Sequence, residues 1–195
     1  MASPLPPPRR IVASNLALQS SGADSFNEPA VELLDETITR TPVFDGLERA
    51  AVFTHASVPT NNDGSGPFVL DKAPGAGVVL PGGANVYYLD LAPDLASPMH
   101  RTVSTDYCVI LAGEPTYITP AVPFNVVNGK GDYEKTQETL CKAGDVVIQR
   151  GEMHSWANRT DEWVRIFCVI LAANPSQTPT GDGKLTEPLG ERWLS

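Results

Sequence analysis

Short apolar runs separated by turn residues follow one another along residues 84–172. These runs are rich in β-branched and aromatic residues and are bounded by Gly, Pro and Asn, which is typical of short strands joined by tight loops. The predicted strands are residues 84–91, 105–112, 115–119, 136–141, 144–149, 155–158 and 163–172, with 120–135 as a long hairpin loop. The 16 glycines and 18 prolines also favour a turn-rich β protein over a helical bundle. The sequence therefore predicts an all-β fold, a sandwich or a barrel.

The first part of the chain is less regular. Residues 9–18 and 50–56 have the composition of strands, and residues 59–67 that of a loop. Between the two strands, the acid-rich stretch 21–50 predicts a solvated segment of loops with one helical turn. The main body is thus expected to have an irregular N-terminal extension.

This organisation predicts one domain, since 195 residues is within the usual range for a single domain. Residues 1–8 form a flexible Pro-rich leader. The domain is expected to span 9–173, with its core at 84–173. A tail follows over 174–195, in which Trp193 is expected to pack against the body.

Charge and hydropathy exclude several partners. Asp and Glu number 23 against 14 Lys and Arg, giving a formal net charge of −9, which argues against binding nucleic acid. The longest apolar run, residues 166–173, is far shorter than the roughly 20 residues of a membrane helix. No apolar signal region follows the N-terminus, and Cys108, Cys141 and Cys168 form no CxxC pair. We therefore expect a cytoplasmic protein with reduced thiols and no nucleotide cofactor.

Two stretches place histidines in a pattern with glycines and polar residues. The first, PMHRTVSTDYCVILAGE, covers residues 98–114 and contains His100, Asp106 and Gly113. The second, GDVVIQRGEMHSWAN, covers residues 144–158 and contains Gly144, Gly151, His154 and Asn158.

Together these stretches resemble the two motifs of the cupin family, G-x5-H-x-H-x3,4-E-x6-G and G-x5-P-x-G-x2-H-x3-N. They look most like small single-domain cupins of bacteria and of fungal secondary-metabolite pathways. The resemblance is specific over residues 84–172 and implies a jelly-roll β-barrel. It also implies that His100 and His154 meet inside that barrel, beside Asp106.

The chain departs from the cupin motifs at three positions. Thr102 stands where the family has its second histidine, Asp106 where it has glutamate, and Gln149 where it has proline. His100, Asp106 and His154 could still form a two-histidine, one-carboxylate site for Fe, Mn, Ni or Zn. The competing interpretation is a metal-free pocket in which the same three groups act as catalytic acid and base. The sequence leaves both open.

Strand parity indicates which side chains share a face. Because side chains at even spacing point to the same side of a strand, Asp106, Cys108 and Ile110 are expected to face inwards together. The candidate substrate-binding residues are His55, Thr102, Gln149, Arg150 and Trp156. Arg150 is included because guanidinium binds carboxylates in a bidentate manner.

The leading functional hypothesis is a small-molecule tailoring enzyme, a lyase or isomerase that dehydrates, decarboxylates or cyclises a polyketide-like or aromatic intermediate. The first alternative is a metal-dependent dioxygenase that uses His100, Asp106 and His154. The second is a binding protein that holds a small ligand without converting it. The cupin resemblance further implies a homodimer built with residues 9–20.

Overall fold

The structure is a computed structural model that describes residues 2–18, 28–66 and 78–194. The described residues form strands, turns and irregular segments, and none of them is helical. No helix within these ranges could therefore span a membrane. The strands are β1 (Arg9–Asn15), β2 (Val31–Thr37), β3 (Thr41–Phe44), β4 (Leu47–His55), β5 (Ala84–Leu91), β6 (His100–Arg101), β7 (Ser104–Ala112), β8 (Thr116–Pro120), β9 (Val126–Val127), β10 (Lys130–Gly131), β11 (Thr136–Leu140), β12 (Val146–Gln149), β13 (Ser155–Ala157), β14 (Val164–Ala172) and β15 (Arg192–Trp193).

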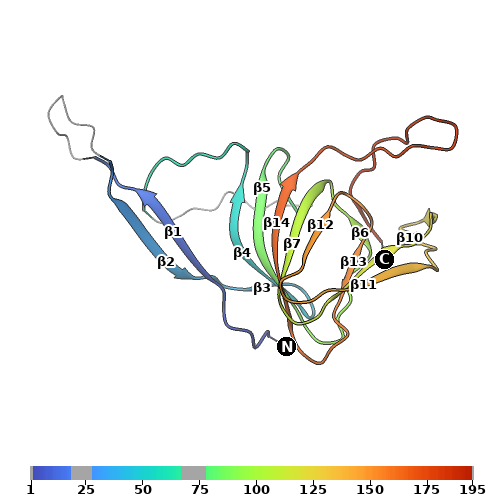
Figure 1. Cartoon of the computed structure of the whole chain (residues 1–195), viewed down its shortest axis with the longest axis horizontal. Coiled ribbons are helices and arrows are strands. Elements are labelled where there is room, and N and C mark those ends of the chain that lie inside the picture. Colours follow the sequence, from blue (N-terminus) through green and yellow to red (C-terminus); the bar gives the residue numbers. More distant parts are fainter. Residues whose placement is uncertain (1, 19–27, 67–77, 195) are drawn as a thin grey trace.

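Two antiparallel sheets make up the body of the molecule (Figure 1). The larger has the strand order β12-β7-β14-β5-β4-β3, and the smaller has the order β11-β8-β13. Trp156 of the small sheet belongs to the same apolar core as Tyr87, Cys108 and Ile166 of the large one, so the sheets enclose that core between them. The prediction of an all-β jelly roll is confirmed, with the barrel built as two facing sheets within the described residues.

The alternation of side chains along β7 determines which of its residues face the core. Asp106, Cys108 and Ile110 are buried, whereas Tyr107 and Leu111 are exposed on the outer face. The predicted parity of this strand is therefore confirmed. The two neighbouring strands fix the register, because β12 pairs along one edge of β7 and β14 along the other.

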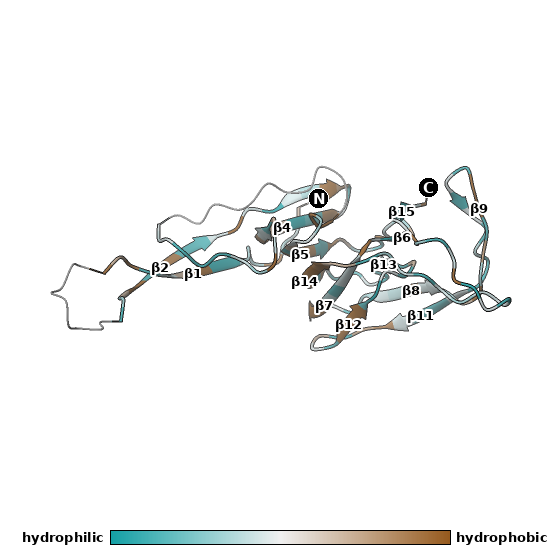
Figure 2. Cartoon of the chain, turned by 90° about the horizontal axis from the view of Figure 1, so that it is seen from above, coloured by the Kyte–Doolittle hydropathy of each residue, from teal (hydrophilic) through white to brown (hydrophobic). Residues whose placement is uncertain are grey.

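β1 and β2 form a separate two-stranded arm that extends away from the body (Figures 1 and 2). The prediction of loops and a helical turn over 21–50 is therefore wrong for residues 31–50, where β2, β3 and the start of β4 lie; residues 21–27 fall outside the described ranges. Cross-strand ion pairs offset the acidic charge of β2. Arg9 donates to Asp35 from the neighbouring strand, and Arg10 donates to Glu36 at 3.0 Å.

The C-terminal segment returns to the body and confirms the expected packing of Trp193. Trp193 pairs with His100 in a short β15–β6 ladder, and the backbone N–H of Leu194 donates to Met99 at 2.9 Å. The buried side chain of Leu194 packs with Met99 and Met153 in a small second core. This anchor places the indole beside the cavity described next.

Candidate active site

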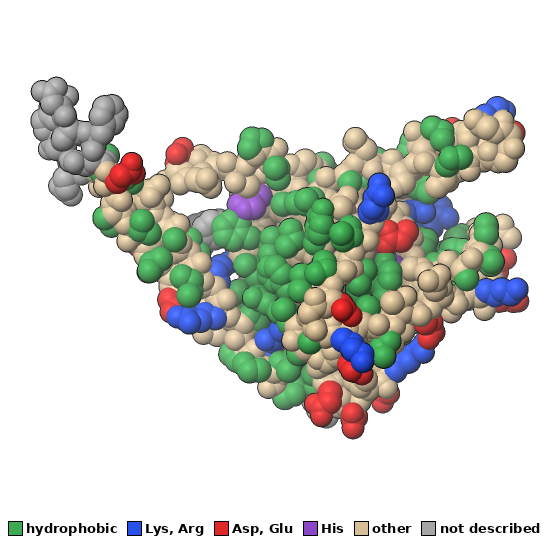
Figure 3. All heavy atoms as spheres, in the orientation of Figure 1, with side chains coloured by type: hydrophobic (Ala, Val, Ile, Leu, Met, Phe, Trp, Pro, Cys, Tyr) green, Lys and Arg blue, Asp and Glu red, His purple; other side chains and the backbone are tan. Residues whose placement is uncertain are grey.

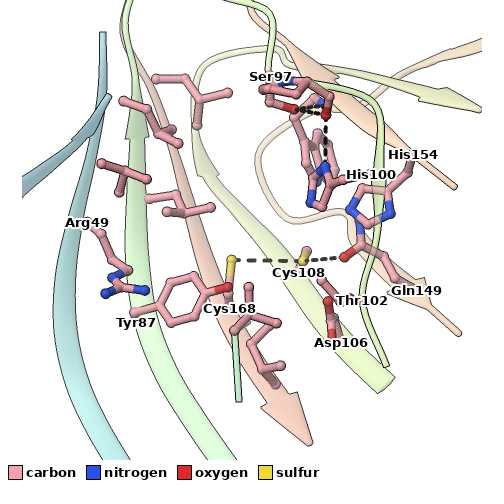
Figure 4. A pocket seen from close by; sticks show the side chains of 18 of the residues that line it. Arg49, Tyr87, Ser97, His100, Thr102, Asp106, Cys108, Gln149, His154 and Cys168 are labelled. Carbon is pink, nitrogen blue, oxygen red and sulfur yellow. Dashed lines mark hydrogen bonds between the residues drawn. The ribbon is translucent and has the colours of Figure 1, made fainter. Parts of the chain in front are cut away.

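A cavity of about 240 Å³ lies between the two sheets, and its walls are mostly apolar (Figure 4). This volume is slightly below the roughly 300–1,000 Å³ of sites for drug-sized ligands, which favours a compact ligand. The predicted site residues that line it are His100, Thr102, Asp106, Gln149, His154 and Trp156. The fold thus brings together most of the residues selected from the sequence.

Two predicted substrate-binding residues lie elsewhere. His55, at the end of β4, lines a groove beside the β1–β2 arm, and its ring contacts Phe53 at a centroid distance of 4.5 Å. Arg150 is exposed just after β12 and lines a different depression with Gly151 and Ser176. Neither side chain is among those lining the cavity, because the strand ends turn them away from it.

The two motif histidines face each other across the cavity wall. His100 and His154 exchange backbone hydrogen bonds, each with an N···O distance of 2.8 Å, and their ring centroids are 4.3 Å apart. The Nδ1 atom of His100 lies 2.8 Å from the carbonyl oxygen of Pro98. A carbonyl can only accept, so this contact assigns the proton to Nδ1 and leaves Nε2 of His100 as an acceptor.

Burial keeps both imidazoles neutral. Desolvation lowers the pKa of His100, and desolvation together with the neighbouring His100 lowers the pKa of His154 to about 3. His154 is almost fully buried, with Nδ1 lying 3.1 Å from the carbonyl oxygen of Glu152. At neutral pH the two rings can therefore donate or accept hydrogen bonds without carrying charge.

Gln149 joins the carboxylate to the second histidine. The amide orientation that satisfies both ends puts its nitrogen 3.0 Å from Oδ2 of Asp106. In that orientation its oxygen accepts from Nε1 of Trp156 at 3.2 Å and lies 3.1 Å from Nε2 of His154. Gln149 is buried and directly opposite Asp106 in the β12–β7 ladder, so strand register holds this bridge in place.

Asp106 carries a buried carboxyl group whose two oxygens differ in their contacts. Only 4% of the residue is exposed, and desolvation raises its pKa to about 6. Its Oδ1 atom has no hydrogen-bond partner among the described residues. A buried, unpartnered carboxylate oxygen is costly, and such a group is often found where a ligand is to be bound.

Several fungal proteins are similar to this chain. No protein-family model matches the sequence. The chain is 38% identical over 110 residues to phomopsin biosynthesis cluster protein D of Diaporthe leptostromiformis, covering 56% of the chain and 49% of that protein. It is 31% identical over 94 residues to a cupin-domain-containing oxidoreductase of Hypocrea virens, covering 44% and 41%. The chain is thus similar to fungal proteins of biosynthesis clusters and to proteins named as cupin-domain-containing oxidoreductases.

Further relatives and solved structures also match parts of the chain. The chain is 33% identical over 114 residues to oryzines biosynthesis cluster protein J of Aspergillus oryzae, covering 58% of the chain and 55% of that protein. It spans about half the length of these curated relatives. Among solved structures, an RmlC-like cupin from Shewanella frigidimarina matches with a TM-score of 0.42 at 10% identity, covering 70% of the chain and 85% of the other. An oxalate oxidase matches with a TM-score of 0.36 at 18% identity, covering 46% and 42%.

The predicted metal triad is not assembled in this cupin homologue. His100, Asp106 and His154 do not form a group able to hold a metal ion, nor do any other His, Cys, Asp and Glu residues within the described ranges. The contacts of His154 give the reason, because Nδ1 and Nε2 each lie 3.1 Å from a protein oxygen. The residues present therefore do not fit a three-ligand metal centre, and the chemistry below uses only their own groups.

The cupin-motif asparagine has a structural role. Asn158 is fully buried, and its side-chain nitrogen contacts the carbonyl oxygens of Leu91, Ala92 and Glu162 at 2.7–3.2 Å. Its side-chain oxygen accepts from Thr160. Asn158 thus fixes the loop between β13 and β14, and this loop leads from Trp156 back to the large sheet.

Sequence reasoning missed three contributors to the cavity as site residues. Trp193 lines the cavity from the C-terminal segment, although it lies 93 positions from the histidine that it contacts. Cys108 and Cys168 also line it, with their Sγ atoms 3.8 Å apart. The signal for Cys108 was present, since it shares the inward face of β7 with Asp106, whereas nothing local marks Trp193 or the pairing with Cys168.

Proposed function

We propose that this cupin homologue is a proton-transfer enzyme, a lyase or isomerase acting on a compact, largely apolar small molecule. The observation that carries this proposal is Asp106, a buried carboxyl group whose pKa is raised to about 6 and whose Oδ1 has no partner among the described residues. A base whose pKa lies close to the working pH suits general acid–base catalysis.

The residues take distinct roles in such a reaction. Oδ1 of Asp106 accepts a proton from the carbon next to a substrate carbonyl, or from a hydroxyl group. Nε2 of His100, left without a proton by the Pro98 contact, is the second proton acceptor. Gln149 and His154 hold the Asp106 carboxylate in place through the amide bridge. The apolar walls exclude water and so protect a reactive intermediate.

The walls of the cavity and the relatives both support a substrate class. Aromatic rings that line the cavity belong to Phe44, Tyr87, Trp156 and Trp193. Flat, conjugated molecules pack well against such rings. Two relatives are named as proteins of biosynthesis clusters. These observations support a polyketide-like or aromatic secondary-metabolite intermediate as substrate.

Hydrogen exchange tests the proposal without knowledge of the natural substrate. The purified chain is incubated in D₂O with a panel of small aromatic ketones, and deuterium incorporation next to the carbonyl is followed by NMR. We expect exchange above the buffer rate, and a loss of about 100-fold or more in Asp106→Asn and in His100→Gln.

His55→Gln and Arg150→Ala serve as matched controls, because both residues lie outside the cavity and should leave exchange unchanged. Equal exchange in wild type and Asp106→Asn would refute the proposed base. Ligand binding without exchange for any ketone would instead favour the binding-protein alternative.

An oxidoreductase is the second candidate, because relatives from Hypocrea virens and Aspergillus ruber are named cupin-domain-containing oxidoreductases. The two candidates differ in their need for an electron acceptor. Oxygen consumption during turnover, with no product formed under anaerobic conditions, would favour the oxidoreductase. Full activity under anaerobic conditions would favour the proton-transfer enzyme.

We also propose that two copies associate through the β1–β2 arm. The arm exposes large apolar side chains, namely Ile11, Val31 and Leu33. The outer face of the large sheet is apolar as well, as Figure 3 shows, with Tyr107, Leu111, Val146, Ile148 and Leu171 exposed. Exposed apolar patches of this kind often mark interfaces, which supports the homodimer expected from the cupin resemblance.

A further inference from the structure

Two of the three cysteines form a pair in the cavity wall. Cys108 of β7 and Cys168 of β14 are directly opposite each other in the antiparallel ladder, and their Sγ atoms are 3.8 Å apart (Figure 4). Both thiols are free, both residues are buried, and both line the cavity. The pair joins residues 60 positions apart in the chain.

The backbone at this pair suits a disulfide. Directly opposite residues of antiparallel strands have Cα atoms about 4.5–5.5 Å apart, and disulfides span Cα distances of about 4.4–6.8 Å. Closing the bond needs the two sulfurs to approach from 3.8 Å to about 2.05 Å, a movement that side-chain rotation can supply. No strand has to shift its register.

The cavity gives small reagents a path to these sulfurs. Cys141 is equally buried, but it is not among the residues that line the cavity, and its Sγ contacts the carbonyl oxygen of Thr139 at 3.6 Å. Cys141 is therefore a matched control, because its thiol is buried but does not face the cavity through which small reagents enter. The neighbouring Cys108 and burial raise the pKa of Cys168, so Cys168 rests as a neutral thiol at neutral pH.

We propose that Cys108 and Cys168 are a reversible dithiol–disulfide couple in the cavity wall, oxidised by small organic disulfides that enter the cavity. One cysteine loses its proton and attacks the reagent, which releases one thiol and leaves a mixed disulfide. The second cysteine then attacks the protein sulfur of that mixed disulfide, which releases the second thiol. Overall the protein loses two hydrogens and the reagent disulfide is reduced to two thiols.

Oxidation changes the cavity beside the proton-transfer groups. Sγ of Cys108 lies 3.7 Å from the Gln149 amide, which is the bridge to Asp106. A disulfide pulls this sulfur towards β14 and so away from the amide. The couple is independent of the proposed enzyme activity, since its formation is measured on the protein alone.

Intact-mass spectrometry of the folded chain tests the couple. The protein is exposed to bis(2-hydroxyethyl) disulfide, quenched with an alkylating agent under denaturing conditions, and mapped by proteolysis. We expect the loss of two hydrogens, a peptide linking Cys108 to Cys168, an alkylated Cys141, and full reversal by dithiothreitol. The Cys108–Cys168 link should form at least about tenfold faster than any adduct at Cys141.

Variants separate closure of the pair from general thiol reactivity. Cys141→Ser should behave as wild type, whereas Cys108→Ser and Cys168→Ser should stop at a mixed disulfide or remain unmodified. Far-ultraviolet circular dichroism checks that each variant is folded. In the wild type, a stable mixed disulfide without the link, a faster adduct at Cys141, or no reaction under conditions that oxidise the unfolded chain would each overturn the proposal.

Discussion

The indole of Trp193 lies parallel to the imidazole of His100, with ring centroids 4.0 Å apart and an angle of 6° between the planes. His100 in turn contacts His154, which contacts Tyr117 at a centroid distance of 5.6 Å. Trp193 is 48% exposed and also lines the cavity, so it lies where the cavity meets solvent. The C-terminal segment therefore supplies part of the candidate site.

Removing the indole should weaken ligand binding and the proposed activity. Trp193→Ala loses an aromatic contact worth about 0.5–1.5 kcal/mol, so we expect kcat/KM in the exchange assay to fall by up to about tenfold. Trp193→Phe keeps a ring on His100 and should retain most of the rate. If Trp193→Ala and wild type have the same kcat/KM, the indole is not part of the working site.

The raised pKa of Asp106 should appear in the stability of the protein. Its pKa is about 6 in the folded state and 3.8 in the unfolded state, so the folded state binds more protons between these values. Its contribution to stability therefore falls as pH rises through this window, by up to about 3 kcal/mol above pH 6. Asp106→Asn should raise the free energy of unfolding, relative to wild type, more at pH 8 than at pH 4. Urea unfolding at both pH values measures this difference, and an equal effect at both would contradict it.

His154 should give the opposite pH dependence. Its pKa is about 3 in the folded state and 6.5 in the unfolded state, so the unfolded state binds more protons between these values. The free energy of unfolding should therefore fall on acidification, by about 2 kcal/mol from this group between pH 7 and pH 5. His154→Gln should flatten this slope, whereas His55→Gln, outside the cavity, should keep it. If the free energy of unfolding of His154→Gln depends on pH as steeply as that of the wild type, another group is responsible.

The β1–β2 arm should control association. Sedimentation at micromolar concentration is expected to give twice the chain mass of 20.9 kDa. Ile11→Lys combined with Leu33→Lys places charges on the exposed apolar face of the arm and should give monomers. Val127→Lys, a change at an equally exposed residue away from the arm, should leave the dimer intact. A wild-type protein that sediments only as a monomer would end the dimer proposal.

Much of the body could be predicted because its signals are local. The strand at 84–91 coincides with β5, and the alternation of β7 correctly assigned the inward face of Asp106 and Cys108. The cupin resemblance implied that His100 and His154 meet, and an isolated β-bridge joins these two residues.

The sequence predictions failed where long-range pairing outweighs local composition. The acidic residues of β2 suggested a solvated loop, but Arg9 and Arg10 of β1 neutralise two of them across the ladder. His55 was selected by residue type alone, and its strand ends outside the cavity. Gln149, at the proline position of the motif, lies 3.1 Å from the Nε2 atom of His154, a contact that the motif spacing did not predict.

The docking of the C-terminal segment has a consequence for biosynthesis. Leu194 packs with Met99 and Met153, and Trp193 reaches His100 from the far end of the chain. During translation, the two sheets are already made when this segment is still inside the ribosome. The cavity of the nascent protein therefore stays open on one side until Trp193 emerges and packs on His100, and a ribosome stalled before Trp193 would display a body that lacks one wall of its site.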